Sequence, residues 1–417
     1  MTNRVVISGM GAITAIGNTP SALFASALSG RSGVRPAQEL AVGQVIPLVA
    51  SANFDPETVI PRQRSAPMDR ATAMALAAAR QAFLDAGENL SPGSPRTGIY
   101  WGTAMGAAGT LEDSYRSVFR DNNLRLKPTS IPTGMNNAPA AVISLEFGVT
   151  GPALTYSVAC SSSTVAIGEA MRAIRHGIID CAIVGGSEAL LTRGVLAAWM
   201  ALRTLARHDP QDASRSCKPF SSDRTGFVLG EGAAALILES FDRAMERRAH
   251  IYAELCGFGL TSDATHIADP SSDGQSRAID TALQDAQMVP ADIGYINAHG
   301  TATIAGDRAE VESIRRVFGT HADGVAVSST KALHGHVMGA PGAIEFMITL
   351  LALESGSLPP TAHLTLPDPE LGLDFIPNSA RHGIALSAVL SSSFGFGGSN
   401  AVLVARKMSA YGHSASG

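Results

Sequence analysis

Three pairs of similar segments recur in the same order along the two halves of the chain. Each pair combines an apolar stretch of strand length with closely spaced glycines, and the pairs are Arg4–Thr14 with Ala253–Thr261, Gly98–Ala104 with Gly294–Ala302, and Gly230–Leu238 with Gly395–Val404. Ordered repetition of this kind indicates a duplicated structural unit. We therefore predict two related αβ halves that meet near Arg247–Ile251.

The length of the chain and the spacing of its apolar residues support the same division. With 417 residues, the chain exceeds the size at which one hydrophobic core stops growing. Apolar runs of strand length, such as Cys181–Gly186, alternate with segments in which apolar residues recur at helical spacing. This alternation is typical of parallel sheets covered by helices on both faces. We predict an α/β protein with an N-terminal half at residues 1–250 and a C-terminal half at residues 251–417.

Composition excludes several classes of protein. Hydrophobic residues make up 45% of the chain and charged residues only 16%, which is typical of a compact enzyme rather than a disordered protein. The formal net charge of −5 argues against broad nucleic-acid binding. Apolar stretches such as Ala343–Leu353 are too short to span a membrane. The four cysteines lack paired or metal-ligand spacing and no targeting segment is evident, so we expect a cytoplasmic protein.

Cys160 lies between a short apolar stretch and an Ala-rich segment with helical spacing. Ser161–Ser163 are favourable residues for the start of a helix, which we predict to run to about His176 before Gly177 ends it. A thiol at a helix N-terminus is near the positive end of the helix dipole, which lowers its pKa. This stretch alone fits a nucleophile and a buried structural cysteine equally well. Cys181, by contrast, lies in a predicted buried strand and is expected to be inert.

Two histidines follow predicted strands in loops of small residues. His299 lies in the segment Asn297–Asp307, and His336 lies five residues after Lys331 in a glycine-punctuated loop. A single histidine is usually structural, but loops that follow strands are where α/β proteins form their sites. A zinc site at His334 and His336 is not favoured, because their spacing is not that of ligands on a helix.

The glycine-rich segments do not indicate a cofactor. Ser392–Asn400 lacks the lysine of a phosphate-binding P-loop, and Gly9–Gly17 does not match the dinucleotide-binding fingerprint. The chain also has no Gly-x-Ser-x-Gly motif of a nucleophilic serine. Glycines can instead allow backbone N–H groups to approach a reacting oxygen. We predict no bound cofactor and no metal ion.

Four stretches in this order resemble the β-ketoacyl-acyl-carrier-protein synthase family, of the elongating KAS I/II type. They are the segment around Cys160, Asn297–Thr301, Ser329–His336 and Gly395–Gly398. The resemblance covers nearly the whole chain and favours Cys160 as a nucleophile over a structural cysteine. It implies a thiolase-like fold with a five-layer αβαβα architecture, a homodimer, and decarboxylative Claisen condensation of malonyl-acyl carrier protein (ACP) with an acyl chain.

The resemblance implies a role for each catalytic residue. Cys160 would carry the acyl chain as a thioester. His299 and His336 would donate hydrogen bonds to the malonyl thioester carbonyl and stabilise the enolate. Lys331 would organise the histidines electrostatically, with Glu345 as its partner. Neutral donors suit this reaction because decarboxylation itself generates the carbanion and no strong base is needed.

The resemblance also implies residues that bind substrate. The N–H groups of Cys160 and Phe396 would form an oxyanion hole, and Phe396 would act as a gate opposite Asp263. Thr301 and Thr303 would hydrogen-bond the phosphopantetheine arm that ACP carries. Met105 and Trp199 would line the acyl pocket, and Ser130 would approach it across the dimer interface. Arg203 would contact the carrier protein.

The chain departs from the usual family pattern at several positions, which are Ala66, Pro67, Val158, Thr265, Ala302, Ile304 and Ser399. These departures leave the chemistry intact but keep open whether the product is a fatty acid or a specialised polyketide or polyene-type chain. The sequence also leaves open the length and unsaturation of the acyl chain and the identity of the carrier protein. It leaves open whether the chain forms a homodimer or a heterodimer. The alternatives are a non-catalytic subunit like a chain-length factor, which is disfavoured because such partners lose the active cysteine, and a thiolase-fold acyltransferase.

Overall fold

A ten-stranded mixed sheet runs through the computed structural model, which describes residues 2–87 and 93–408. The strand order is β11-β10-β12-β13-β9-β1-β8-β6-β4-β5. The strands of the first half are β1 (Val5–Thr14), β4 (Thr97–Gly102), β5 (Ala153–Tyr156), β6 (Cys181–Glu188) and β8 (Gly232–Ser240). Those of the second half are β9 (Ala253–Ser262), β10 (Ile293–Asn297), β11 (Ala326–Ser328), β12 (Ala388–Gly395) and β13 (Ser399–Arg406).

The strand order is the same when read outward from the β1–β9 junction in either direction. β1, β8, β6, β4 and β5 correspond to β9, β13, β12, β10 and β11. In each half the two pairs nearest the junction are antiparallel and the two outermost pairs are parallel. The segment pairs found in the sequence occupy matching positions in this order, namely β1 with β9, β4 with β10, and β8 with β13.

The prediction of parallel sheets was wrong for the strands next to the junction. β12 and β13, for example, form an antiparallel hairpin whose turn contains Gly397 and Gly398 at φ 81° and 75°. Almost every residue of these strands is buried. A strand that is covered on both faces reads as a continuous apolar run whatever its direction, so the sequence pattern could not distinguish the two arrangements.

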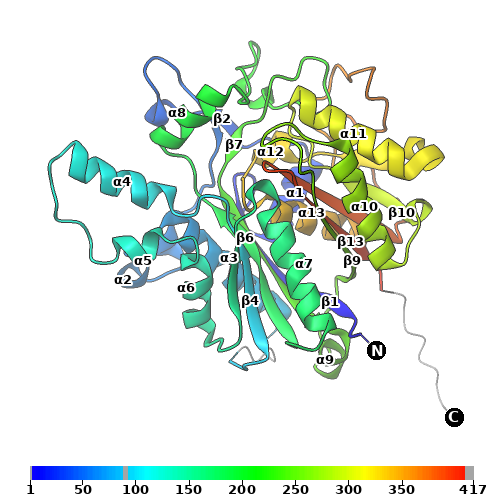
Figure 1. Cartoon of the computed structure of the whole chain (residues 1–417), viewed down its shortest axis with the longest axis horizontal. Helices are drawn as coiled ribbons and strands as arrows, with labels where there is room; N and C mark the ends of the chain where they lie inside the picture. Colours follow the sequence, from blue (N-terminus) through cyan, green and yellow to red (C-terminus); the bar gives the residue numbers. More distant parts are fainter. Residues whose placement is uncertain (1, 88–92, 409–417) are drawn as a thin grey trace.

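Helices form three layers that alternate with the two halves of the sheet (Figure 1). The outer face of the first half is covered by α3 (Arg70–Ala86) and α6 (Ala138–Phe147), and that of the second half by α10 (Ser272–Ala286) and α11 (Ile304–Phe318). Between the halves lie α7 (Ser162–Arg175) and α13 (Pro341–Ser355), which contact each other and strands of both halves. This arrangement confirms the predicted five-layer αβαβα fold.

The repeated glycines explain how each half packs. A Cβ atom added to Gly11 of β1 would lie 2.0 Å from the carbonyl oxygen of Ala78 in α3. One added to Gly259 of β9 would lie equally close to the carbonyl oxygen of Ala278 in α10. Both strands therefore need glycine where an alanine-rich helix approaches their backbone.

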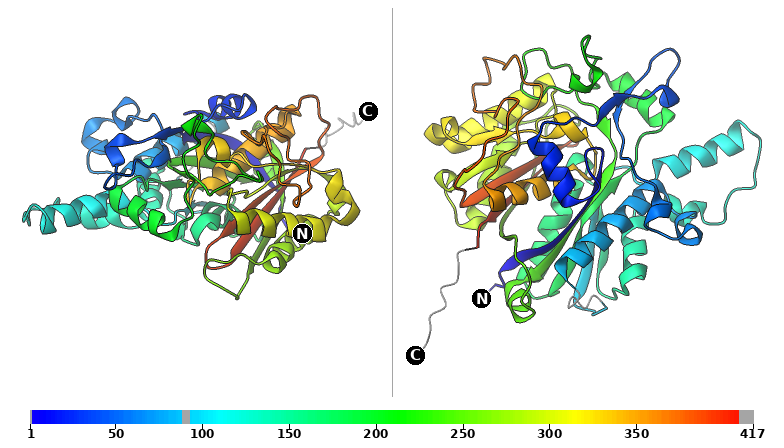
Figure 2. Two further views of the ribbon diagram at one scale, coloured as in Figure 1. Left: turned by 90° about the horizontal axis from the view of Figure 1, so that it is seen from above. Right: turned by 180° about the vertical axis from the view of Figure 1, so that it is seen from behind.

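The remaining helices lie around this body. α4 (Ala108–Phe119) and α5 (Ser130–Gly134) belong to an arm, residues 104–137, that projects from one end of the molecule, as Figure 2 shows. The other helices are α1 (Pro20–Leu28), α2 (Arg62–Ser65), α8 (Arg193–Leu202), α9 (Phe241–Glu246) and α12 (Lys331–His334). A small second sheet contains β2 (Val34–Pro36), β3 (Leu48–Ala50) and β7 (Leu229–Gly230). Within the two described ranges, no helix has both the length and the apolar character needed to cross a membrane.

Candidate active site

A strained turn carries Cys160 from strand β5 to helix α7. The cysteine lies in a short 3₁₀ turn at Ala159–Ser161, and α7 follows at Ser162–Arg175, close to the predicted helix. Ala159 has a left-handed backbone conformation with φ 52°. This conformation costs a residue with a side chain roughly 1–2 kcal/mol. The turn places a largely buried thiol at the start of the helix, as expected for a residue that the fold presents for chemistry.

Two buried histidines of the C-terminal half face this thiol. The Nε2 atom of His336 lies 3.0 Å from the Sγ atom of Cys160. The ring of His299 meets that of His336 edge-on, with ring centroids 5.4 Å apart. One donor atom from each of the three residues lies within 4.8 Å of the other two. A neutral His336 can thus accept the thiol proton, or donate a hydrogen bond to a sulfur anion.

Hydrogen bonds to the backbone fix both histidine loops. The carboxylate of Glu310 accepts from the N–H groups of His299 and Gly300, each at 2.7 Å. The N–H group of His336 donates to the carbonyl of Val228 at 2.7 Å. Sequence reasoning missed Glu310, which is buried in α11. The sequence sign that could have identified Glu310 is its place among the apolar positions of that helix. A carboxylate at a buried position needs hydrogen-bond donors, so it is expected to hold a nearby loop.

Lys331 and Glu345 form a fully buried ion pair close to the histidines. The Nζ atom of Lys331 lies 2.5 Å from Oε1 of Glu345, which is also 3.9 Å from Nε2 of His334. Burial, and after it the Lys331 charge, hold the pKa of His299 and the pKa of His336 well below the ordinary value. Both imidazoles are therefore neutral near pH 7, as the resemblance implies for hydrogen-bond donors.

Burial acts on Cys160 in the direction opposite to the expected helix-dipole effect. It raises the pKa of the thiol to about 12, although the Lys331 charge and the N–H group of Phe396 lower it. The expectation of a lowered pKa was wrong, because desolvation of the thiolate outweighs the charge of Lys331 and the N–H group of Phe396. Burial also raises the pKa to about 12 in the other three cysteines, Cys181, Cys217 and Cys256. Cys160 therefore differs from the other three cysteines in its contact with His336, and not in the fraction of thiol that is ionised.

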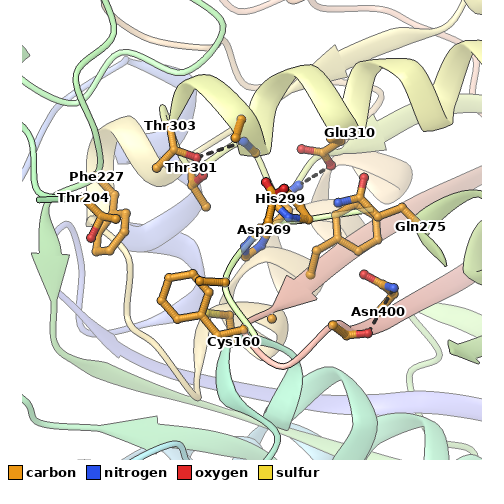
Figure 3. Close-up of a pocket in the computed structure, with 18 of the residues that line it drawn as sticks. Cys160, Thr204, Phe227, Asp269, Gln275, His299, Thr301, Thr303, Glu310 and Asn400 are labelled. Atoms are coloured by element: carbon orange, nitrogen blue, oxygen red, sulfur yellow. Dashed lines mark hydrogen bonds between the residues drawn. The ribbon is translucent and has the colours of Figure 1, made fainter. Parts of the chain in front are cut away.

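One cavity of about 170 Å³ opens onto the thiol (Figure 3). Of the residues singled out from the sequence, its wall contains Cys160, Trp199, Asp263, His299, Thr301, Thr303, His336 and Phe396. The hydroxyl groups of Thr301 and Thr303 lie 2.9 Å apart, next to the start of α11. No lysine or arginine of the described ranges lines this cavity.

Aromatic rings connect the predicted gate residue to His336. The ring of Phe396 stacks on that of Trp199, with centroids 5.9 Å apart and an interplanar angle of 20°. Trp199 meets Phe227 edge-on, and Phe227 meets His336 edge-on in turn. Phe227 was not singled out from the sequence, because an aromatic residue in a loop carries no local sign of its contacts.

The turn of Phe396 is joined to the loop that contains Asp263. The N–H group of Asp263 donates to the carbonyl of Gly398 at 2.9 Å, and that of Gly397 donates to the carbonyl of Ile267 at 2.7 Å. The Asp263 carboxylate accepts from the side-chain amide of Asn400 at 2.6 Å. Asp263 therefore fixes the position of the glycine-rich turn.

Five residues singled out from the sequence lie outside the lining of this cavity. The Lys331 charge lowers the pKa of both histidines, and Glu345 forms an ion pair with Lys331. Met105 is 45% exposed, and its backbone N–H group donates to the carboxylate of Glu188. Ser130 begins α5 on the projecting arm, and Arg203 is exposed immediately after α8.

The sulfur and imidazole groups also form a donor set that could hold a metal ion. Thiolate and neutral imidazole are ligands that zinc accepts. That this site works without a metal ion stays a prediction from the sequence.

Iodoacetamide is expected to label Cys160 before the other three cysteines. All four thiols are buried and have a raised pKa, but Cys160 alone among them lines the cavity and contacts a histidine that can take its proton. Peptide mapping by mass spectrometry after brief exposure measures the order of labelling. Earlier modification of Cys181, Cys217 or Cys256 would contradict the assignment of Cys160 as the reactive thiol.

Comparison with known families and proteins gives matches over nearly the whole chain. Residues 2–244 match the family described as "Beta-ketoacyl synthase, N-terminal domain", and residues 252–365 match "Beta-ketoacyl synthase, C-terminal domain". The chain is 38% identical over 412 residues to 3-oxoacyl-[acyl-carrier-protein] synthase 2 of Staphylococcus aureus (strain COL), covering 98% of this chain and 99% of that protein.

Two solved structures are similar over the same extent. The ishigamide ketosynthase/chain length factor superposes with a TM-score of 0.90 and 31% identity, covering 98% of this chain and 100% of that one. A type II polyketide acyl-carrier protein in complex with its ketosynthase, AntDE:AntF, gives a TM-score of 0.89, 29% identity and the same coverage.

Proposed function

Because the chain belongs to the β-ketoacyl synthase family and is a 3-oxoacyl-ACP synthase, we propose that Cys160, His299 and His336 perform its decarboxylative condensation. The observation that carries these roles is the 3.0 Å contact between Cys160 Sγ and His336 Nε2, with His299 beside it in one cavity. A non-catalytic partner subunit is not favoured, since nucleophile and histidines are assembled together.

In the first step, Cys160 takes the acyl chain from acyl-ACP. Its sulfur forms a bond to the acyl carbonyl carbon, and the bond between that carbon and the sulfur of the phosphopantetheine arm breaks. The thiol proton passes through His336 to the departing arm, so one thiol is consumed and another is produced. A resting pKa of about 12 is compatible with this exchange, because no free thiolate has to accumulate. The N–H groups of Cys160 and Phe396 stabilise the oxyanion.

In the second step, malonyl-ACP loses carbon dioxide. Once Sγ is acylated, His336 gains a proton at Nε2 and releases one from Nδ1, so that the ring stays neutral. In this Nε2–H tautomer it donates to the malonyl thioester carbonyl together with His299. The electron pair of the breaking carbon–carbon bond moves into the thioester as an enolate, which these neutral donors stabilise. Since no lysine or arginine of the described ranges lines the cavity, the malonyl carboxylate gains no ion pair there that would oppose its departure.

In the last step, the enolate carbon attacks the acyl carbonyl on Cys160. A carbon–carbon bond forms, the carbon–sulfur bond breaks, and the sulfur takes one proton from solvent through His336. Burial, and after it the Lys331 charge, keeps both histidines neutral in the resting site, and the ion pair with Glu345 holds the lysine cation in position. Lys331 and Glu345 are therefore positioning residues.

ACP is the proposed partner that delivers both substrates. Thr301 and Thr303 line the cavity and offer hydroxyl groups to the phosphopantetheine arm. Arg203 is exposed and could contact acidic groups of the carrier. The AntDE:AntF structure, in which a ketosynthase binds an acyl-carrier protein, supports the same kind of contact for this chain.

A second chain is proposed to cover the projecting arm and strand β5. β5 is an edge strand, and an unpaired edge favours pairing with another strand. The arm exposes large apolar side chains, which are Leu111, Tyr115, Phe119, Leu124, Leu126, Ile131 and Met135. A patch of this kind marks a protein interface. We propose a homodimer in which Ser130 and Met105 approach the acyl pocket, and the ishigamide structure supports a chain length factor as the alternative partner.

The boundary between residues 1–250 and 251–417 is likewise proposed as the junction of two duplicated halves. The mirrored strand order around β1 and β9 supports it.

The purified protein is expected to convert acyl-ACP and malonyl-ACP into 3-oxoacyl-ACP with release of carbon dioxide. Mass spectrometry of the carrier protein measures the product. A panel of acyl chains on different carrier proteins identifies the pathway, because fatty-acid and polyene-type intermediates differ in length and unsaturation. Release of carbon dioxide without any 3-oxoacyl product across the panel would contradict the proposed condensation.

A further inference from the structure

Gln275 is a buried side chain in the wall of the catalytic cavity. It lies in the first turn of α10, is 1% exposed, and lines the same cavity as Cys160 and His299. The turn is held closely against its surroundings, since a Cβ atom added to Gly274 would collide with the Asp263 carboxylate. The backbone therefore holds Gln275 in place beside the cavity.

The amide of Gln275 has no partner of its own. Its Oε1 atom is buried without a hydrogen bond, and no hydrogen bond of its Nε2 atom occurs within residues 2–87 and 93–408. The polar side chains near it are already engaged: Glu310 with the N–H groups of His299 and Gly300, and Asn400 with Asp263. A buried polar side chain without a partner is rare, and one in the wall of a cavity indicates a ligand group that completes it.

The chemistry of the wall selects the kind of ligand. An amide side chain is completed by a group that both donates and accepts, whereas a carboxylate can only accept. The same wall contains the acidic residues Asp263, Asp269 and Glu310 and no lysine or arginine of the described ranges, so an anionic group beside Gln275 would gain no ion pair there. A neutral amide satisfies both conditions. The phosphopantetheine arm carries such a group two carbons from its sulfur.

We propose that Gln275 pairs with the amide of the phosphopantetheine arm nearest the thioester and so determines recognition of the arm. Figure 3 places Thr301 and Thr303 on one side of His299 and Gln275 on the other. An arm that enters the cavity is thus contacted from two walls. This proposal rests on the proposed condensation, because it takes the ACP thioesters as substrates.

The test compares thioesters with and without that amide, using Gln275→Met. N-acetylcysteamine thioesters carry the amide, and S-pentyl thioesters match their length without it. With butyryl-N-acetylcysteamine and malonyl-N-acetylcysteamine, the substitution is expected to lower kcat/KM about tenfold, the scale of losing two neutral hydrogen bonds. With S-pentyl thioesters it is expected to have no effect. Acylation of Cys160 is followed by mass spectrometry, and malonyl decarboxylation by release of carbon dioxide.

Three outcomes would overturn the proposal. The first two are an equal loss of kcat/KM with and without the substrate amide, and no loss of kcat/KM with any thioester. The third is a loss confined to the malonyl thioester, which would assign Gln275 to binding of the malonyl carboxylate. Gln284→Met, an exposed position on the same helix, is the matched control. Thermal unfolding checks the fold of each variant, and Gln275→Leu replaces Gln275→Met if the latter does not fold. Wild-type protein that fails to condense ACP substrates would instead contradict the proposed function.

Discussion

Replacement of Cys160 by glutamine is expected to abolish condensation while malonyl-ACP is still decarboxylated. An amide side chain cannot form the acyl thioester, so acyl transfer should fall by about four to six orders of magnitude, the scale for loss of a catalytic nucleophile. Decarboxylation should persist because it depends on hydrogen bonds from His299 and His336, which remain. The change also removes the sulfur that engages Nε2 of His336 in the free enzyme.

Two measurements separate these half-reactions. Mass spectrometry of the protein after exposure to acyl-ACP detects the thioester, and release of carbon dioxide from malonyl-ACP reports decarboxylation. Cys256→Ala is the matched control, since Cys256 is equally buried but lies outside the cavity and should retain both activities. Acylation of the Cys160→Gln variant, or complete loss of its decarboxylation, would contradict the division of roles between thiol and histidines.

The sequence predicted the fold where local patterns report directly on packing. The closely spaced glycines of β1 and β9 recur because each strand meets the backbone of an alanine-rich helix, as the contacts of Gly11 and Gly259 demonstrate. The directions of β8 and β13 could not be predicted in this way. Both faces of these strands are buried, so their apolar runs contain no information about the neighbouring strand.

The sequence also pointed to most of the side chains that meet in the cavity. Cys160, His299 and His336 each follow a strand in a segment of small residues, and the resemblance to a known family implied a catalytic role for each. Their electrostatics could not be predicted. Local reasoning places Cys160 in the field of a helix N-terminus, but the raised pKa arises from burial by segments far away in the chain.

Residues that act through tertiary contacts were missed for the same reason. The left-handed conformation of Ala159 has no sequence sign, because glycine or asparagine is the usual residue there. Gln275 is one glutamine in a polar helix segment, and only its burial beside His299 distinguishes it.

Replacement of His336 by alanine is expected to slow malonyl-ACP decarboxylation by about 10²–10³-fold, the scale for loss of one oxyanion donor. The pKa of His336 and the pKa of His299 lie well below their ordinary value, so both imidazoles stay neutral between about pH 6 and pH 8. The wild-type decarboxylation rate should therefore show no histidine titration across this range. Protonation of either imidazole between pH 8 and pH 6, followed by NMR of the histidine rings, would contradict neutral donors. The rate alone does not report on the histidines, because burial raises the pKa of Glu310 and the pKa of Glu345 to about 7.

The same variant should also slow acyl transfer, because the thiol loses the group that accepts its proton at 3.0 Å. A histidine that only filled space would leave both half-reactions unchanged once the protein had folded, which makes the double loss diagnostic. His382→Ala is the control, since His382 is an exposed histidine outside the cavity lining. Thermal unfolding separates a catalytic loss from an unstable protein. If folded His336→Ala protein decarboxylates malonyl-ACP at the wild-type rate, His299 alone stabilises the enolate and the two-donor mechanism is wrong.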